Sequence, residues 1–298
     1  MQKKSLTIFL AILVSLAIIM GIVMANKNKP EREQHQNFKI VTSFYPIYVM
    51  TASITEGAHN IELVNMTETN VGCLHDYTLT TNDMKKIEKA NVIVENGLKL
   101  ESFNDKIISA YPKLTVIDSS IGVQNTINED DEVNPHIWTS LDNYMSQVKV
   151  ITEKLSLANE ENAELYQQNS KEYLKRLKEL KTQYEANLQN VKGKKAICLN
   201  EALAYLADEV GLNAIVIETD HEESTLSAET LKNLIQMMKQ EDMQMILVDK
   251  EDSLKNAQTL ANETGAKIVA LDSGLTGNFT KDAYLNAMKE NLNILQQL

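Results

Sequence analysis

Two of the five histidines lie where an imidazole suits a metal ion. His75 is in a loop that follows a strand-like run and precedes a helix-like one. His136 directly follows Pro135, which restrains the backbone before it, and the acidic run Glu129 to Glu132 stands upstream. A lone histidine is usually an exposed or hydrogen-bonded residue, so the residue type alone decides nothing. Imidazole on a restrained loop is a common metal ligand, which makes both histidines candidates.

The common catalytic and nucleotide-binding motifs are absent from this sequence. It contains no G-x-S-x-G, no G-x-x-x-x-G-K-[ST], no G-x-G-x-x-G and no H-E-x-x-H. With 29 Lys and Arg against 41 Asp and Glu, the formal net charge is −12, which argues against nucleic acid as a partner. Two cysteines exclude a disulfide scaffold and a metal site of four thiolates.

Short runs rich in Val and Ile alternate with longer segments of helical period, which is typical of parallel sheets. These runs are residues 38–44, 61–66, 91–96, 115–119, 195–200, 214–219, 245–250 and 267–272. They form two groups of four on either side of residues 163–191, where apolar residues spaced three and four apart share one helix face. The pattern predicts an α/β chain with two lobes, residues 39–162 and 192–298, each with a parallel sheet.

The amino terminus has the pattern of an exported protein. Lys3 and Lys4 precede an uncharged apolar stretch from Leu6 to Ala25. This stretch is long enough to span a bilayer and also ends in small residues, so residues 1–25 are either a signal peptide or a membrane anchor. Residues 26–38 are polar and aperiodic, as expected of a tether. The folded part is therefore expected outside the cytoplasm, anchored or secreted.

Five sequence segments together resemble one known family. They are TSFYPIY (42–48), HDY (75–77) with the run at 80–103, NPHIW (134–138), NEALAYLADEVGL (200–212) and ETGAKIVALDSGL (263–275). In this order they resemble the substrate-binding proteins of transition-metal ABC importers, the zinc and manganese group of ZnuA-like proteins. The resemblance extends from about residue 39 to the end. It implies two α/β lobes joined by one long rigid helix, with a metal cleft between the lobes.

The resemblance also implies four metal ligands, two from each lobe. By position, the two histidines of the first lobe correspond to His75 and His136, and the final aspartate corresponds to Asp272. The third ligand, His or Glu in the family, falls on Asn200. An amide carbonyl is a neutral and weaker oxygen ligand than a carboxylate or an imidazole, so this departure puts affinity or selectivity in doubt.

Other residues could complete the site in place of Asn200. Glu201 is adjacent, and His221 follows a strand-like run. Asp249 and Glu251 end another such run near the expected cleft, but acids at strand ends are often solvated and we expect that of both.

The two cysteines each stand two positions before a candidate ligand. Cys73 precedes His75, and Cys198 precedes Asn200. Residues two apart in a strand share a face, so Cys198 and Asn200 are expected to point the same way. Three outcomes are open: two unrelated buried thiols, a disulfide across the cleft, or a thiolate that completes the metal site.

These features predict a monomeric solute-binding protein rather than an enzyme. Its cargo would be a divalent transition metal, zinc in preference to manganese, delivered to an ABC permease in the membrane. One rival is a metal-dependent hydrolase with Glu201 as base, against which stands the lack of a separate nucleophile. A second rival is an adhesin or scaffold that has lost metal binding, which the Asn200 departure favours.

Overall fold

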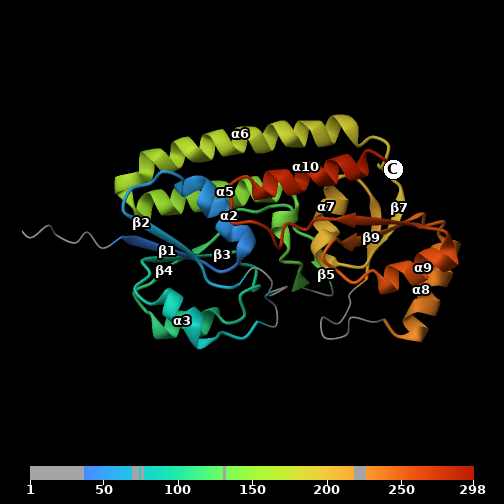
Figure 1. The fold of residues 1–298 in the computed structure, drawn as a ribbon, viewed down its shortest axis with the longest axis horizontal. Helices are drawn as coiled ribbons and strands as arrows, with labels where there is room; N and C mark the ends of the chain where they lie inside the picture. Colours follow the sequence, from blue (N-terminus) through green and yellow to red (C-terminus); the bar gives the residue numbers. More distant parts are fainter. Residues whose placement is uncertain (1–36, 69–73, 75–76, 130–131, 218–225) are drawn as a thin grey trace, which may run out of the picture. The chain divides into compact units, whose positions relative to one another are not determined.

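The computed structural model describes residues 37–68, 74, 77–129, 132–217 and 226–298. Phe38–Leu298 forms one compact unit (Figure 1). Among the described residues, no helix is both long and apolar enough to cross a bilayer. The predicted signal peptide or anchor at 1–25 and nearly all of the tether lie outside the described residues, and both stay predictions.

The first lobe is built on a four-stranded parallel sheet with the order β2-β1-β3-β4. Its strands are β1 (Phe38–Thr42), β2 (Ile61–Asn65), β3 (Val92–Glu95) and β4 (Thr115–Asp118). Its helices are α2 (Tyr45–Thr55), α3 (Thr81–Ile87), α4 (Asn104–Ala110) and α5 (Leu141–Ala158). α3 lies on one face of the sheet, and α2 and α5 lie on the other (Figure 1). Every residue of β3 is buried, as expected for a central strand covered on both faces.

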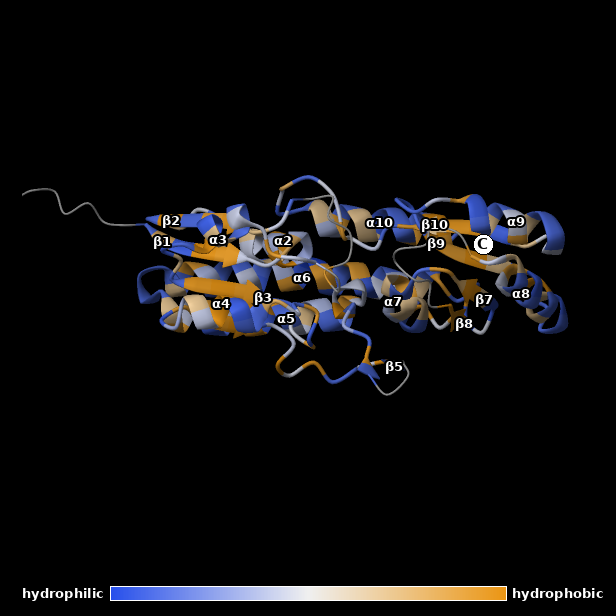
Figure 2. Cartoon of the chain, turned by 90° about the horizontal axis from the view of Figure 1, so that it is seen from below, coloured by the Kyte–Doolittle hydropathy of each residue, from blue (hydrophilic) through white to orange (hydrophobic). Residues whose placement is uncertain are grey.

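The second lobe repeats this plan with the order β10-β9-β7-β8, again parallel throughout. Its strands are β7 (Lys195–Cys198), β8 (Asn213–Val216), β9 (Met245–Asp249) and β10 (Lys267–Leu271). Its helices are α7 (Ala204–Glu209), α8 (Ala228–Gln240), α9 (Lys255–Thr264) and α10 (Ala283–Leu295). The strands of both sheets are mostly hydrophobic, whereas charged and polar residues line the outer helices (Figure 2). The predicted α/β class with two parallel sheets is confirmed.

A long helix, α6 (Ala163–Asn187), stands between the two groups of strands. It ends four residues before the predicted end at 191, because the chain leaves the helix at Leu188 and turns, with the N–H of Val191 donating to the carbonyl of Leu188. Leu188 and Val191 are both buried. Leu188 and Val191 are three residues apart and both face the core, as residues on one helix face would. The predicted helix was therefore too long at this end.

The residues at the two ends of the acidic run upstream of His136 pair with each other, which the sequence pattern does not indicate. β5 (Asn128–Glu129) pairs antiparallel with β6 (Glu132–Val133). Three short 3-10 helices complete the described elements: η1 (Ile137–Thr139), η2 (Glu160–Asn162) and η3 (Glu201–Leu203). η1 and η3 directly follow His136 and Asn200, so both candidate ligands stand at helix starts.

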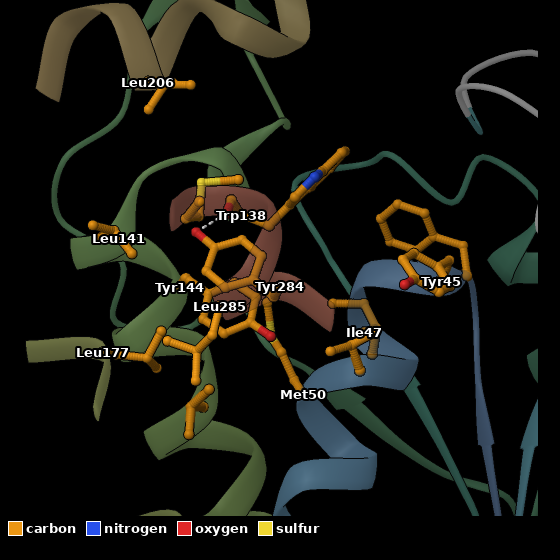
Figure 3. Close-up of a cluster of buried hydrophobic side chains, with 14 of the residues drawn as sticks. Tyr45, Ile47, Met50, Trp138, Leu141, Tyr144, Leu177, Leu206, Tyr284 and Leu285 are labelled. Carbon is orange, nitrogen blue, oxygen red and sulfur yellow. Dashed lines mark hydrogen bonds between the residues drawn. The ribbon is translucent and has the colours of Figure 1, made fainter. Parts of the chain in front are cut away.

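Helices from both halves of the sequence share one apolar core (Figure 3). Tyr144 of α5 stacks on Tyr284 of α10, with ring centroids 3.5 Å apart, and its hydroxyl lies 3.0 Å from that of Tyr173 in α6. α10 follows the last strand of the second sheet yet contacts both α2 and α6. The carboxyl-terminal helix thereby fixes the second group of strands against helices of the first lobe.

Candidate metal centre

Both sheets reverse their strand order at points where polar residues follow the strands. The chain runs from β1 to β2 on one side and to β3 on the other, and from β7 to β8 and β9 in the same manner. In open α/β sheets, ligands bind outside the carboxyl ends of the strands at such switch points. Asn96 follows β3, Asn200 and Glu201 follow β7, and Lys250 follows β9. The topology therefore gathers polar side chains at the edges where a ligand would bind.

Asn134 fixes the orientation of the His136 ring. Oδ1 of Asn134 accepts the backbone N–H of His136 at 2.9 Å, which identifies that atom as the amide oxygen. The same oxygen lies 2.8 Å from Nδ1 of His136, so Nδ1 carries a proton, and in the neutral form of the ring Nε2 carries the lone pair. Oxygen acceptors commonly orient metal-binding histidines in this way. The ring is buried, with 2% of the residue exposed.

Residues from both lobes support the loop that carries His136. The side-chain amide of Asn96 donates to the carbonyl of Pro135 at 2.9 Å. The hydroxyl of Tyr205, in α7, donates to the carbonyl of Asn134 at 2.7 Å. These bonds use the backbone carbonyls of the two residues before His136. Side chains of both lobes therefore fix the backbone of the loop.

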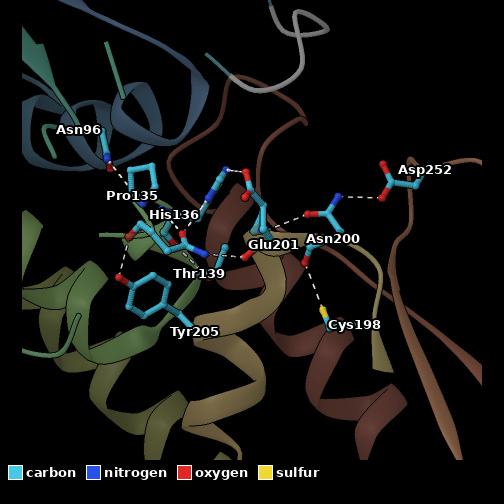
Figure 4. A network of polar contacts seen from close by, with 11 residues as sticks. Asn96, Pro135, His136, Thr139, Cys198, Asn200, Glu201, Tyr205 and Asp252 are labelled. Atoms are coloured by element: carbon cyan, nitrogen blue, oxygen red, sulfur yellow. Dashed lines mark hydrogen bonds and ion pairs between the residues drawn. The ribbon is translucent and has the colours of Figure 1, made fainter. Parts of the chain in front are cut away.

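Glu201 faces His136 from the other lobe. Its Oε1 lies 3.7 Å from Nε2 of His136, and the amide of Asn134 donates to the Glu201 carbonyl at 3.1 Å. The carboxyl group points toward the imidazole ring (Figure 4). Both its side chain and its backbone thus meet the NPHIW loop, at the start of η3.

The side-chain amide of Asn200 bonds to the start of η3 on one side and to Asp252 on the other (Figure 4). Its Oδ1 accepts the backbone N–H of Ala202 at 2.9 Å and so caps η3. Its Nδ2 donates to Oδ2 of Asp252 at 2.7 Å. Cys198 is buried, and its thiol donates to the Asn200 carbonyl at 3.1 Å. Both ends of the Asn200 amide thus have partners within the chain.

Asp272 follows β10 with its carboxylate largely enclosed. Oδ1 accepts the N–H of Gly274 at 2.8 Å, and Oδ2 lies 2.7 Å from Nζ of Lys250. The fully buried amide of Asn291 pairs with both backbone groups of Asp272, at 2.8 Å each. The hydrogen bond to Asp272 raises the pKa of the Lys250 amino group above its ordinary value. The carboxylate is therefore held in position and is paired with a cation.

A direct hydrogen bond joins the two turns that carry His136 and Asp272. The indole Nε1 of Trp138 donates to the carbonyl of Ser273 at 3.0 Å. The indole ring also lies 5.2 Å from the imidazole of His136, centroid to centroid. His136 is thus two residues, and Asp272 one residue, from the hydrogen bond between Trp138 and Ser273 that joins the lobes.

Buried acids stand behind this site in the first lobe. Glu101 accepts the backbone N–H groups of Asn96 and Gly97 and the hydroxyl of Ser43, at 2.7, 3.1 and 2.8 Å. Burial raises the pKa of Glu101 to about 7, although these bonds oppose the shift. Burial and the nearby Glu101 raise the pKa of Glu95 to about 8. By fixing Asn96, Glu101 indirectly supports the carbonyl of Pro135.

His75, Cys73 and His221 lie outside the described residues. The structure therefore reports no position for the second predicted histidine, for one of the two cysteines or for one alternative ligand. Within the described part of the chain, no three His, Cys, Asp or Glu side chains are grouped as a metal site would need. The predicted ligands His136 and Asp272 are brought to neighbouring turns, and Glu201 rather than Asn200 faces the histidine.

Sequence reasoning missed the residues that surround the predicted ligands. Asp249, expected to be solvated, is only 5% exposed, and its carboxylate accepts the N–H of Ser273 at 2.9 Å and that of Glu251 at 2.8 Å. That expectation was wrong for Asp249, because the end of β9 pairs with β10 and the carboxylate bonds to the turn that follows β10. Lys250 and Asp252 contact Asp272 and Asn200 in the same region. The charged run DKED (249–252) at the end of an apolar strand was the sequence signal that could have indicated these contacts.

Comparisons with known proteins show the family to which this chain belongs. The family model for the zinc-uptake complex component A, periplasmic (ZnuA), matches residues 40–298. ZnuA of the high-affinity zinc uptake system of Bacillus subtilis (strain 168) is 27% identical over 281 residues, covering 86% of each chain. Zinc-binding protein AdcA of Streptococcus pyogenes serotype M3 is 28% identical over 287 residues, covering 87% of this chain and 55% of AdcA. This chain thus spans about half the length of the AdcA relatives it matches.

Solved structures share the fold. A crystal structure of ZnuA has a TM-score of 0.74 at 25% identity, covering 87% of this chain and 98% of that one. FpvC from Pseudomonas aeruginosa in complex with Ni²⁺ has a TM-score of 0.77 at 25% identity, covering 88% and 96%. The family consists of solute-binding proteins for zinc uptake, which makes the hydrolase alternative wrong. The chain belongs to the periplasmic ZnuA family of zinc-uptake components.

Proposed function

We propose that this chain is an extracytoplasmic solute-binding protein that captures one divalent transition metal, zinc in preference to manganese, and delivers it to an ABC permease. The observation that carries this proposal is the pair His136 and Glu201, with Nε2 and Oε1 3.7 Å apart. They come from different lobes and meet at the strand switch points, where α/β proteins bind ligands. Family membership and the zinc-binding relatives support zinc as the cargo.

The ligand set that we propose contains His75, His136 and Asp272, with a fourth ligand from the turn that opens η3. Either Asn200 or Glu201 supplies it. The geometry favours Glu201, because its carboxylate faces His136, whereas both ends of the Asn200 amide already have protein partners. A carboxylate is also a stronger ligand for a divalent cation than a neutral amide. Two imidazoles and two carboxylates suit tetrahedral zinc.

The preference for zinc over manganese follows from these donors. Affinity of a given nitrogen and oxygen site rises from manganese toward zinc in the divalent series, and imidazole suits zinc particularly well. The bound ion is cargo rather than a catalyst. A net charge of −12 favours an incoming cation and disfavours nucleic acid, and the chain is expected to act as a monomer at the outer face of the membrane, anchored or secreted.

Uptake of radioactive zinc by cells tests capture and delivery together. Cells that lack this chain are expected to accumulate zinc several-fold more slowly in chelator-treated medium, because no soluble carrier loads the permease. The wild-type chain should restore uptake, and so should His59→Ala, which alters an exposed histidine outside the proposed ligand set. His136→Ala should not. Equal restoration by His136→Ala would contradict the proposed function.

A further inference from the structure

The carboxylate of Asp272 forms an ion pair with the ammonium group of Lys250. Nζ of Lys250 lies 2.7 Å from Oδ2, a distance typical of a charge-assisted hydrogen bond. The Asp272 side chain is 8% exposed and that of Lys250 is 38% exposed. Because Oδ1 accepts the N–H of Gly274, the ammonium ion occupies the carboxylate oxygen that remains. A metal ion binding to Oδ2 would have to take the place of the ammonium ion.

The backbone fixes Lys250 beside Asp272. The N–H of Lys250 donates to the carbonyl of Leu271 at 2.8 Å, in line with the parallel pairing of Asp249 with Leu271. The carboxylate of Asp249 accepts the N–H of Ser273 at 2.9 Å, so a second bond joins the ends of the two strands. Lys250 therefore remains within reach of Asp272, whereas its long, half-exposed side chain can swing.

Glu251 is a second acid close to the Lys250 ammonium group. Oε1 of Glu251 lies 4.0 Å from Nζ of Lys250, and its side chain is 61% exposed. Glu290 also acts on Lys250 at longer range. When a metal takes Asp272, the lysine can turn outward toward Glu251 and water. When the metal leaves, Lys250 can pair with Asp272 again, so the enclosed Asp272 carboxylate always has a cationic partner.

We propose that Lys250 sets the metal affinity of this chain by competing with the metal ion for Asp272. This rests on the proposed function, because it takes Asp272 as a ligand. The ammonium ion stabilises the metal-free state, lowers the affinity for zinc and lowers the barrier to release at the permease. Exposed ion pairs contribute little to stability, but here one partner is nearly buried, so the pair is screened less than a surface pair.

Substitution of Lys250 by methionine, which is uncharged and of similar length, tests the proposal. We expect Lys250→Met to bind zinc about tenfold more tightly in chelator competition, equivalent to ~1.4 kcal/mol. Lys255→Met is the matched control, since it removes the same charge from an exposed residue at the start of α9 and should change affinity less than twofold. Lys250→Arg keeps a cation and should stay near wild type. At 1 M salt, where charges are screened within about 3 Å, the tenfold difference should persist.

Thermal unfolding gives a second, independent measurement. Metal-free Lys250→Met should have a lower Tm than the wild type, because Asp272 loses its partner, and zinc should raise its Tm more than it raises that of the wild type. Unchanged or weaker zinc binding by Lys250→Met would overturn the proposal, and so would an equal gain in Lys255→Met.

The two proposals fail in distinguishable ways. If the wild type binds no zinc, the proposed function fails. The role of Lys250 then survives only if Lys250→Met gains zinc binding, and it is overturned if neither protein binds. If the wild type binds zinc and Lys250→Met does not bind it more tightly, the function stands and the competition by Lys250 is wrong.

Discussion

His136→Ala is expected to weaken zinc binding at least a hundredfold. Loss of groups that only orient a ligand commonly lowers metal affinity 10–100-fold, and loss of the ligand itself should exceed that. Asn134 accepts the hydrogen bond from the N–H at Nδ1, so in the neutral form of the ring the fixed loop leaves the Nε2 lone pair available to a metal ion. Affinity is measured by competition with a chromophoric chelator, and circular dichroism checks the fold.

His59→Ala is the matched control for that measurement. His59 is exposed in the first lobe, and its backbone rather than its ring is bonded to Asn162. Its zinc affinity should equal that of the wild type. An affinity of His136→Ala within threefold of the wild type would remove His136 from the ligand set.

The same titration decides between Asn200 and Glu201. Glu201→Gln keeps the size of the side chain and removes the charge that faces His136, so we expect at least a tenfold loss of affinity. Asn200→Ala should lower affinity less than threefold, while the lost cap of η3 destabilises the chain by about 1 kcal/mol. The reverse order would make Asn200 the fourth ligand.

Trp138→Ala is expected to lower the free energy of unfolding by about 4 kcal/mol. The side chain is fully buried, packs edge-on against Phe44 with ring centroids 5.0 Å apart, and donates its N–H to Ser273. Truncation would leave a large cavity next to an unsatisfied carbonyl, between turns of the two lobes. Urea unfolding followed by circular dichroism measures the change, because Trp138 is the single tryptophan of the chain and its fluorescence is lost in the variant.

Trp138→Phe separates the two contributions. Phenylalanine refills most of the cavity but cannot donate to Ser273, so a loss of about 1–2 kcal/mol is expected. If Trp138→Ala loses less than about 1 kcal/mol, the indole does not join the two turns as the structure indicates.

The strands were predictable because each is a local run of branched apolar residues. The residues at which the strands end were not predictable. The predicted strands include Asn96, Asn200 and Asp272, and the structure places these residues just beyond β3, β7 and β10. These polar residues leave the sheet to bond with turns and neighbouring loops, so their positions depend on the tertiary fold. The same holds for Leu188, where a buried turn continues the spacing of α6.

The sequence also supplied candidates for the site. The family resemblance predicts His136 and Asp272 as ligands, which stays a prediction, and the structure brings their turns together through Trp138 and Ser273. The pairing of Lys250 with Asp272 was not, because it depends on β9 lying beside β10, which no local pattern specifies. The hydrogen bond from Asn200 to Asp252 likewise depends on the tertiary fold, because Asp252 is 52 residues further along the chain.

Native mass spectrometry of the natively purified protein tests most directly whether this chain carries a metal as cargo. We expect about one zinc ion per chain near neutral pH, and loss of that ion as the pH falls through the histidine range near 6.5 and the imidazole ligands take up protons. The His136→Ala protein should carry none under the same conditions. A wild-type chain that stays metal-free after incubation with zinc would contradict metal capture and would favour an adhesin or scaffold that has lost it.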